Sequence, residues 1–223
     1  MFERLELLIG KENINKINNT KVLIIGIGGV GGILAETLVR NGILNITIID
    51  NDIVDITNKN RQILALDSTL GRNKVDVLKE RLLDINSNVN VKTINEFIDS
   101  NNINLIFDNN IDFVIDACDT VSTKILIIEE CVKRNIKVIS SMGMGKKLDL
   151  SKLKVMDIRK TSYDKIAKII RKRLKDDGIK EKVMVLSSDE EVIDTKENIG
   201  SYSPLTNYAG LLIADYVIKE IIK

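Results

Sequence analysis

The fold is decided by the stretch Gly26-Ile27-Gly28-Gly29-Val30-Gly31, which lies between an apolar segment, Lys21–Ile25, and an amphipathic segment, Ile33–Arg40. An apolar strand, a glycine-rich turn and a helix in this order are typical of a nucleotide-binding unit. Glycine lets the backbone turn tightly and approach phosphate oxygens, while the free N–H groups of the following helix face the anion. The stretch therefore predicts a nucleotide site, and a tight turn without a ligand is the alternative.

Strand and helix patterns alternate outward from this run. Further strands are expected at Asn45–Ile49, Val89–Ile94, Phe113–Asp116, Lys137–Ser140, Lys154–Ile158 and Val183–Leu186, and further helices at Lys74–Ile85, Val121–Arg134, Asp164–Lys175 and Leu205–Ile222. This alternation predicts an α/β fold, Rossmann-like and doubly wound, with a mainly parallel sheet and a C-terminal extension of strands and helices. We expect one domain over residues 1–223, with 1–145 as nucleotide-binding core and 146–223 as substrate-side extension and C-terminal helix. Ser188–Ser203 is expected to be a mobile surface loop.

The amino-acid composition excludes or disfavours several classes of protein. The 223 residues are 44% hydrophobic and 29% charged, which is ordinary for a globular protein. The chain has no histidine, the commonest general base and metal ligand, and its two cysteines exclude a four-cysteine zinc site. An acidic residue at position 3 and the short apolar runs argue against a signal peptide and a membrane span. We therefore expect a cytoplasmic protein that involves neither zinc nor a membrane.

Polar residues follow the second expected strand. Asp50 ends that strand about twenty residues after the glycine run, where a carboxylate can bind ribose hydroxyls. The other candidates for nucleotide binding are Asp52, Asn58, Arg61, Gln62 and Lys74. Arginine forks onto phosphate oxygens and lysine acts as a point charge, so this set favours a triphosphate over a nicotinamide dinucleotide. The alternative is that Arg61 and Lys74 are ordinary surface charges.

Asp119 follows the strand Phe113–Asp116, at the edge where open α/β sheets bind ligands. Without histidine a metal must be held by carboxylates, which favours Mg²⁺, and Asp119 can hold Mg²⁺ against phosphates. The alternative, which does not exclude the first, is that Asp119 caps the following helix. Cys118 and Cys131 lack an activating histidine, so both are interpreted as structural thiols and not as nucleophiles.

The net charge of +1 conceals a basic segment. Residues 152–182 contain twelve Lys and Arg against five Asp and Glu. Helical spacing places Lys168, Arg171, Lys172 and Lys175 along one face, with Lys165 and Arg173 nearby. The segment is either a solvated helix face or a surface that contacts phosphates.

The set Gly26–Gly31, Asp50, Asn58-x-x-Arg61-Gln62, Lys74 and Asp119 resembles the ubiquitin-activating-like adenylating enzymes, the superfamily of the ThiF, MoeB and HesA proteins. Two longer stretches, Glu6–Gly10 and Ile139–Asp149 with Lys160-Thr161-Ser162 after it, resemble its branch of tRNA threonylcarbamoyladenosine dehydratases. This likeness extends almost to the C-terminus. The chain departs from the branch at Tyr163-Asp164-Lys165, where a pattern with proline is more usual.

The resemblance implies ATP-dependent adenylation of the threonyl carboxylate of threonylcarbamoyladenosine beside the anticodon of tRNA. Attack by the carbamoyl group then expels AMP and closes a ring, with net loss of water. It implies that Asp50 binds ribose, that Asn58, Arg61 and Lys74 bind phosphates, and that Asp119 serves Mg²⁺ and catalysis. It also implies a homodimer in which Arg4 crosses to the partner's ATP, and it leaves open whether a sulfur-relay protein assists. With tRNA as substrate, the basic helix with Lys165, Lys168, Arg171, Lys172 and Lys175 is the expected tRNA-binding surface.

Three other functions compete with this interpretation. A sulfur-carrier-protein adenylyltransferase commonly has two C-x-x-C zinc pairs, which this sequence lacks. An NAD-dependent oxidoreductase is disfavoured by the missing histidine base and by the Arg61 and Lys74 pair. A non-catalytic nucleotide sensor is the third alternative, and ATP–pyrophosphate exchange would separate the three.

Overall fold

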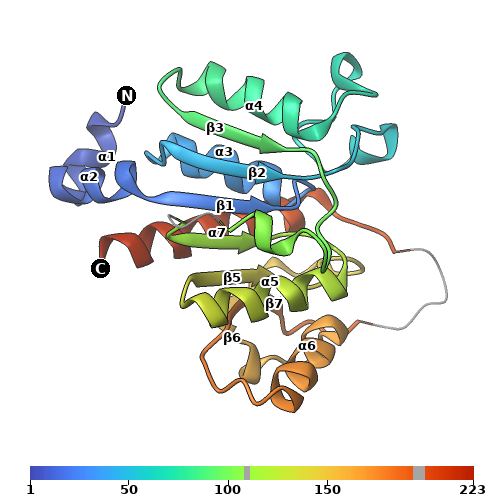
Figure 1. Ribbon diagram of the computed structural model, residues 1–223. Helices are drawn as coiled ribbons and strands as arrows, with labels where there is room; N and C mark the ends of the chain where they lie inside the picture. The colour runs from blue at the N-terminus through green and yellow to red at the C-terminus, as the bar shows by residue number, and fades with distance from the viewer. Residues whose placement is uncertain (108–110, 193–198) are drawn as a thin grey trace.

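The computed structural model describes residues 1–107, 111–192 and 199–223. Within these residues a seven-stranded sheet runs through the molecule in the order β3-β2-β1-β4-β5-β7-β6 (Figure 1). The strands are β1 (Lys21–Ile25), β2 (Asn45–Ile49), β3 (Asn90–Ile94), β4 (Phe113–Asp116), β5 (Lys137–Ser141), β6 (Leu153–Asp157) and β7 (Met184–Ser188). The helices are α1 (Glu3–Ile9), α2 (Lys11–Asn19), α3 (Gly31–Arg40), α4 (Lys74–Ile85), α5 (Val121–Arg134), α6 (Lys165–Asp176) and α7 (Ser203–Ile222).

Neighbouring strands pair in parallel except β6, which is antiparallel to β7. Both faces of the sheet are buried. Val22 and Ile24 of β1 pack with Leu34 of α3 in one core cluster, which also includes side chains of α4 and α7. The alternate residues, Leu23 and Ile25, pack in a second cluster with side chains of α5. Burying each such side chain stabilises the fold by about 1.5–3 kcal/mol. The predicted doubly wound α/β fold is therefore confirmed.

The C-terminal extension belongs to the same sheet as the core. β7 pairs with β5, and α7 crosses the start of α3. A Cβ atom at Gly210 of α7 would lie 2.5 Å from Ile33 Cγ2 and 2.7 Å from the Val30 carbonyl oxygen. The close approach of these two helices therefore requires glycine at position 210. In the segment expected to be a mobile loop, Ser188 ends β7 and Ser203 begins α7, while residues 193–198 lie outside the described residues.

The sequence patterns missed α1 and α2. Their apolar positions are too few for a periodic signal: α2 buries Ile14 and Ile17 among polar residues, and α1, described in full, leaves every side chain at least partly exposed. Both helices precede β1 and lie at the end of the molecule where the strand begins (Figure 1). Among residues 1–107, 111–192 and 199–223 no helix combines the length and apolar character that crossing a membrane requires.

Candidate active site

The glycine run lies at the point where the strand order reverses, between β1 and β4. Gly26 has a φ of +90°, and a Cβ atom there would lie 2.5 Å from the backbone nitrogen of Cys118, just beyond β4. A Cβ atom at Gly31 would lie 1.9 Å from the Gly26 carbonyl oxygen. Only glycine fits at these two positions, because backbone atoms occupy the space of a side chain. Ligands of open α/β sheets bind at such a switch point, and the N-terminus of α3 faces it.

Asp50 is fixed beside the glycine run. Its Oδ2 accepts a hydrogen bond from the backbone N–H of Ile27 at 2.6 Å, and its Oδ1 accepts one from the N–H of Asp52 at 2.9 Å. Each carboxylate oxygen can accept a second hydrogen bond. Asp50 therefore holds the turn after β2 against the glycine run and keeps acceptor capacity for ribose hydroxyls.

The turn around residues 58–62 packs across the glycine run. A Cβ atom at Gly29 would lie 3.3 Å from Arg61 Cγ, and one at Gly28 would lie 3.9 Å from Gln62 Nε2. The Arg61 guanidinium donates through Nη1 to the Thr57 carbonyl and to Asn60 Oδ1, both at 2.9 Å. Sequence spacing thus correctly predicted that this turn and the glycine run lie together.

Two side chains of this turn are buried, with different consequences. Asn58 Oδ1 accepts from the Asp55 N–H at 3.1 Å and closes a short 3₁₀ turn, so this oxygen has a structural role. Gln62 Oε1, in contrast, is buried without a hydrogen-bond partner among the described residues. An unsatisfied buried acceptor is costly unless a bound group or water satisfies it. Its place beside Gly28 fits a nucleotide site.

Lys74 lies at the start of α4 and is only 4% exposed. Its Nζ is 2.7 Å from Asp52 Oδ2, and its backbone N–H donates to the Asp52 carbonyl oxygen at 3.0 Å. The Asp52 side chain is 60% exposed. The two residues expected to contact the nucleotide independently therefore form one ion pair beside the turn after β2.

A buried polar network supports the end of β4. Asp116 is fully buried, and its Oδ2 lies 3.0 Å from Lys124 Nζ of α5 and 2.5 Å from Ser140 Oγ of β5. Lys124 also donates to the Ser141 carbonyl oxygen at 2.7 Å, and Cys118 Sγ donates to Asp116 Oδ1 at 2.9 Å. The network holds the ends of β4 and β5 to α5. The sequence analysis missed Lys124, although a lysine amid the apolar positions of α5 was an available signal.

Asp119 follows this network and is exposed at the carboxyl edge of the sheet. The N-cap of α5 is Thr120, not Asp119, and Thr120 Oγ1 donates to Asp119 Oδ1 at 3.5 Å. The capping role considered for Asp119 is therefore wrong. Within the described part of the chain no three acidic or cysteine side chains form a metal-binding group. One carboxylate nevertheless fits Mg²⁺, which commonly takes one or two protein carboxylates together with substrate phosphates and water.

Neither cysteine has the environment of a reactive nucleophile. Burial, reinforced by the Asp116 charge, raises the pKa of Cys118, and burial also raises the pKa of Cys131. Since the thiolate is the reactive form, both thiols stay protonated at neutral pH. The interpretation of the cysteines as structural thiols agrees with these environments.

The segment 199–206 completes the edge and was missed as part of the site. A Cβ atom at Gly145 would lie 2.3 Å from Ile199 Cγ2, and Asn60 Nδ2 donates to the Ser201 carbonyl oxygen at 3.2 Å. Thr206 Oγ1 would lie 3.1 Å from a Cβ atom at Gly29. The start of α7 thus crosses from the loop after β5 to the glycine run. Only tertiary structure reveals these contacts, because they join residues more than fifty positions apart.

Arg4 lies apart from these residues. It is exposed on α1, beside the amino end of β1, whereas the glycine run follows its carboxyl end (Figure 1). The five residues of β1 span about 17 Å. Leu7 and Leu8 on the same helix are 89% and 80% exposed. The structure therefore does not bring Arg4 to the nucleotide site of its own chain.

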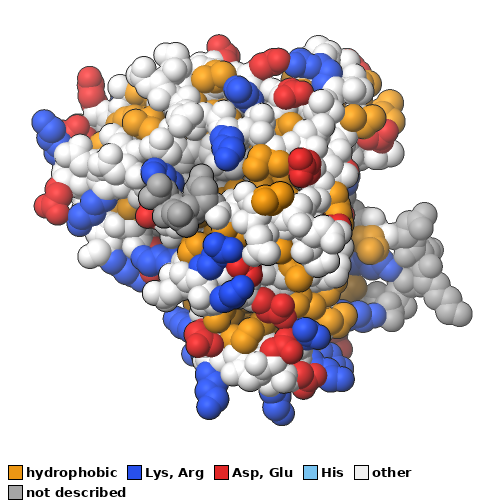
Figure 2. Space-filling model, in the orientation of Figure 1, with side chains coloured by type: hydrophobic (Ala, Val, Ile, Leu, Met, Phe, Trp, Pro, Cys, Tyr) orange, Lys and Arg blue, Asp and Glu red, His pale blue; other side chains and the backbone are white. Residues whose placement is uncertain are grey.

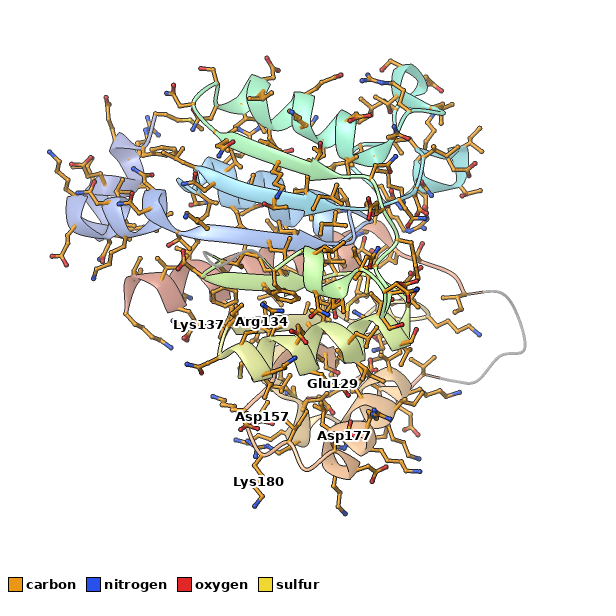
Figure 3. All side chains as sticks on the ribbon, viewed as in Figure 1. Glu129, Arg134, Lys137, Asp157, Asp177 and Lys180 are labelled. Atoms are coloured by element: carbon orange, nitrogen blue, oxygen red, sulfur yellow. The ribbon has the colours of Figure 1, made fainter. Side chains whose placement is uncertain are left out.

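The basic helix α6 begins at the carboxyl edge. Lys168, Lys172 and Lys175 are exposed, whereas Arg171 is half-buried and donates to the Thr161 carbonyl and hydroxyl oxygens at 2.8 and 2.7 Å. Arg173 pairs with Glu129 of α5 and with Asp177, both visible in Figure 3. Lys and Arg side chains protrude from the lower part of the molecule, interspersed with acidic ones (Figure 2). The predicted basic face thus consists mainly of three lysines, because both arginines are engaged within the protein.

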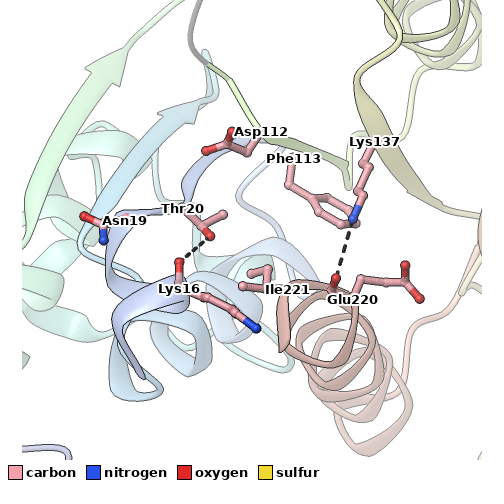
Figure 4. Close-up of a pocket in the computed structure, with 8 residues that line it drawn as sticks. All are labelled: Lys16, Asn19, Thr20, Asp112, Phe113, Lys137, Glu220 and Ile221. Carbon is pink, nitrogen blue, oxygen red and sulfur yellow. Dashed lines mark hydrogen bonds between the residues drawn. The ribbon is translucent and has the colours of Figure 1, made fainter. Parts of the chain in front are cut away.

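A hollow of about 430 Å³ lies at the opposite end of the strands (Figure 4). It is lined by Lys16, Asn19, Thr20, Asp112, Phe113, Lys137, Glu220 and Ile221. Thr20 Oγ1 donates to the Lys16 carbonyl oxygen at 2.8 Å across its floor, and Lys137 Nζ reaches the Glu220 carbonyl oxygen at 3.5 Å. Its lining comes from α2, the amino ends of β4 and β5 and the C-terminal end of α7, so this hollow is separate from the glycine run.

Together, the glycine run at the switch point, the Arg61 turn and the exposed Asp119 define a Rossmann-like nucleotide-binding protein. A profile of the ThiF family matches residues 2–223, and the chain belongs to this family. It is 40% identical to the tRNA threonylcarbamoyladenosine dehydratase of Bacillus subtilis over 100% of this chain and 94% of that protein.

Solved structures agree with the sequence relatives. The crystal structure of E. coli tRNA N6-threonylcarbamoyladenosine dehydratase in complex with AMP superposes with a TM-score of 0.93 at 31% identity, covering 99% of this chain and 93% of that one. The complex of the same enzyme with ATP gives a TM-score of 0.93 at 32% identity, with the same coverage. The resemblance proposed from the sequence motifs is confirmed.

Proposed function

We propose that this protein is an ATP-dependent dehydratase that cyclises threonylcarbamoyladenosine in tRNA beside the anticodon. The observation that carries the proposal is the full-length similarity to enzymes of this name, one of which has been solved with ATP and with AMP. The glycine run, the Arg61 turn and Asp119 meet at one edge of the sheet, as an adenylating site requires.

The reaction starts from a carboxylate, whose carbonyl carbon is a poor electrophile until it is activated. The threonyl carboxylate attacks the α-phosphate of ATP, and pyrophosphate leaves. The carbamoyl group then attacks the activated carbonyl carbon, AMP leaves with the carboxylate oxygen, and a ring closes. A histidine base is not needed for the first step, because the nucleophile is already an anion. The protein's task is to position the reactants and to stabilise the charge that develops on the leaving groups.

Residue roles follow from the geometry. Asp50, anchored to the Ile27 N–H, is proposed to bind ribose, and the N–H groups at the start of α3 face the phosphates. Arg61 and Gln62 pack against the glycine run, Lys74 pairs with Asp52 beside the turn after β2, and all three are proposed to contact the polyphosphate. Asp119 is proposed to hold Mg²⁺, which would neutralise phosphate charge when bound. The buried Asp116–Lys124 pair keeps the turn that carries Asp119 in place.

A homodimer is part of the proposal. Arg4 lies far from its own site, on a helix with two exposed leucines, and a second copy would cover Leu7 and Leu8. Arg4 would then reach the partner's ATP. Sedimentation should show a dimer, and mixing an Arg4→Ala chain with an Asp119→Ala chain should restore part of the activity, because mixed dimers contain one intact site. Activity of a stable monomer would refute this part.

The direct test uses tRNA from a strain that lacks the cyclising enzyme. Incubation with the protein, ATP and Mg²⁺ should convert threonylcarbamoyladenosine to its cyclic form, detected by mass spectrometry of the nucleosides, with one AMP formed per ring. The Asp119→Ala variant is the control. ATP–pyrophosphate exchange stimulated by the C-terminus of a sulfur-carrier protein, without cyclisation of the nucleoside, would favour the sulfur-carrier adenylyltransferase instead. Cytoplasmic location and assistance by a sulfur-relay protein stay predictions.

A further inference from the structure

Tyr163 has a strained backbone at the end of the segment before α6. Its φ is +58°, and the backbone N–H of Asp164 donates to the Ser162 carbonyl oxygen at 2.7 Å, which closes a three-residue turn around Tyr163. A turn of this kind with positive φ at its centre is rare and strained. The other non-glycine residues with positive φ in the described ranges are Asn135 and Lys146, and asparagine tolerates this conformation far better than tyrosine.

Ser162, which precedes Tyr163 in this turn, is bonded to the carboxyl edge of the sheet. Ser162 Oγ donates to Asp189 Oδ1 at 3.0 Å, and Asp189 follows β7 directly and also pairs with Lys154. One residue earlier, Thr161 Oγ1 donates to the Ile158 carbonyl oxygen at 2.7 Å and accepts from Arg171. The hydrogen bonds of Ser162 to Asp189, and of Thr161 to the Ile158 carbonyl and to Arg171, therefore hold the chain that leads into Tyr163.

Asp164, which follows Tyr163 in this turn, is fixed as firmly. Asp164 Oδ1 accepts the N–H of Ala167 and caps α6, while Asp164 Oδ2 is 2.9 Å from Lys147 Nζ in an ion pair whose side chains are 2% and 4% exposed. Lys147 also donates to the Gly143 carbonyl oxygen at 2.6 Å. Both flanks thus hold Tyr163 in its strained conformation, and strain persists only where the surroundings enforce it.

The side chain that this turn presents is exposed. Tyr163 is 60% exposed, although its neighbours Thr161 and Asp164 are buried. Most of this side chain is therefore in contact with solvent and not used for packing within the chain. Strained residues of this kind cluster at ligand-binding sites.

The position of Tyr163 relates it to the proposed active site. Its turn is tied to residues that follow β5 and β7, and Asp119 follows β4, so all lie along the carboxyl edge of one sheet. β4 and β7 are two strands apart, or about 10 Å. The exposed lysines of α6 begin on the other side of the turn. Tyr163 therefore lies between the proposed acceptor of the modified base and the basic helix.

We propose that Tyr163 is an aromatic platform on which an unpaired base of the tRNA anticodon loop stacks while the neighbouring modified adenosine occupies the adenylation site. This inference rests on the proposed function. Sequence-selective proteins recognise single-stranded RNA loops by stacking splayed bases on aromatic side chains, and the lysines of α6 hold the adjoining phosphates. The strained turn fixes the ring before tRNA arrives, so less conformational freedom is lost on binding.

The test uses one variant, which should stabilise the protein and weaken its binding of tRNA. Tyr163→Gly removes the ring and suits the positive φ, so the melting temperature should rise by roughly 2–4 °C. Affinity for the tRNA should nevertheless fall about 5- to 100-fold, the range for losing one stacked base. The slope of log Kd against log salt should stay unchanged, because no phosphate contact is lost. Binding of ATP in the absence of tRNA, measured by calorimetry, is not expected to change.

Two variants serve as controls. Asn135→Gly changes a residue of equal backbone conformation (φ +54°) at the far end of α5, and it should leave tRNA affinity unchanged. Tyr163→Phe keeps the ring and should bind tRNA as the parent does. Because the chain lacks tryptophan, Tyr163→Trp provides a single fluorescent reporter. Its emission should be quenched by an anticodon stem-loop RNA and not by a duplex of equal length.

The outcomes separate the two levels of the proposal. If the parent forms the cyclic nucleoside but Tyr163→Gly binds tRNA with parental affinity, the platform is refuted and the proposed function stands. If Tyr163→Gly instead weakens binding together with a reduced salt slope, the turn acts through phosphates, and the platform is refuted as well. A parent that neither binds nor modifies tRNA refutes the proposed function and this inference with it.

Discussion

Replacing Gly26 with alanine should damage both stability and ATP binding. The positive φ of +90° costs an alanine about 1–2 kcal/mol. The new Cβ atom would lie 2.5 Å from Cys118 N and 2.6 Å from Ala117 C, and these backbone atoms can move only if β4 moves. Such overpacking typically costs about 1–3 kcal/mol more. The free energy of unfolding should therefore fall by about 2–5 kcal/mol.

Two other glycines, Gly178 and Gly31, allow the conformational cost and the steric cost to be measured separately. Gly178 has a similar φ of +72° with nothing within 4 Å of its added Cβ atom, so Gly178→Ala should lose only the conformational part. Gly31→Ala meets the Gly26 carbonyl oxygen without a positive φ and should show the steric part. Urea unfolding with an unchanged m-value gives each cost, and calorimetry should show that Gly26→Ala binds ATP at least about ten-fold more weakly. Equal destabilisation by Gly26→Ala and Gly178→Ala, with parental ATP affinity in both, would refute the reasoning.

Three further variants test the site and its surroundings. Asp119→Ala should lower turnover by roughly 10²–10³-fold and leave the urea midpoint unchanged, because the side chain is exposed; an active variant would show that another group holds the metal. Replacing Lys168, Lys172 and Lys175 with glutamine should weaken tRNA binding and reduce the salt slope by up to about three, with Arg171 retained because it holds Thr161; an unchanged slope would place the RNA elsewhere. Cys118→Ser should keep parental turnover, and the parent should react slowly with iodoacetamide at pH 8, because burial raises the pKa of Cys118 and leaves little thiolate at this pH; rapid labelling that abolishes activity would contradict this.

Local patterns predicted which loops gather at the carboxyl edge of the sheet, and the roles of their residues in nucleotide binding stay predictions. The glycine run, Asp50 and the Arg61 turn each follow a strand of the same parallel sheet, so their convergence at its carboxyl edge follows from the alternation of strands and helices. The extents of β1, β2, β4, α4 and α5 agree with the sequence patterns, because their apolar positions have clear periods.

Other features depend on tertiary contacts that no local pattern contains. Lys124 lies at helical spacing with the buried Ile127, Ile128 and Cys131, but its partners Asp116 and Ser141 are apparent only in the tertiary structure. The segment 199–206 reaches Gly145 and Asn60 only because α7 crosses α3 at Gly210. The pairing of Lys74 with Asp52 was likewise hidden, since each residue type alone indicates a phosphate or metal contact.

The balance of charge at the carboxyl edge predicts that ATP binding depends on positive charge from outside this chain. Asp52 and Lys74 neutralise each other, and the Asp50 carboxylate is satisfied by backbone N–H groups. The Lys74–Asp52 pair carries no net charge, the Asp50 carboxylate offsets Arg61, and Asp119 adds a negative charge, a set that alone attracts a triphosphate weakly. We therefore expect extra positive charge to come from Mg²⁺ at Asp119 and from Arg4 of a second copy, as proposed above. ATP affinity should therefore fall both when Mg²⁺ is chelated and when the protein is diluted below its dimerisation constant. ATP affinity that stays unchanged on both chelation and dilution would contradict this account of the site's electrostatics.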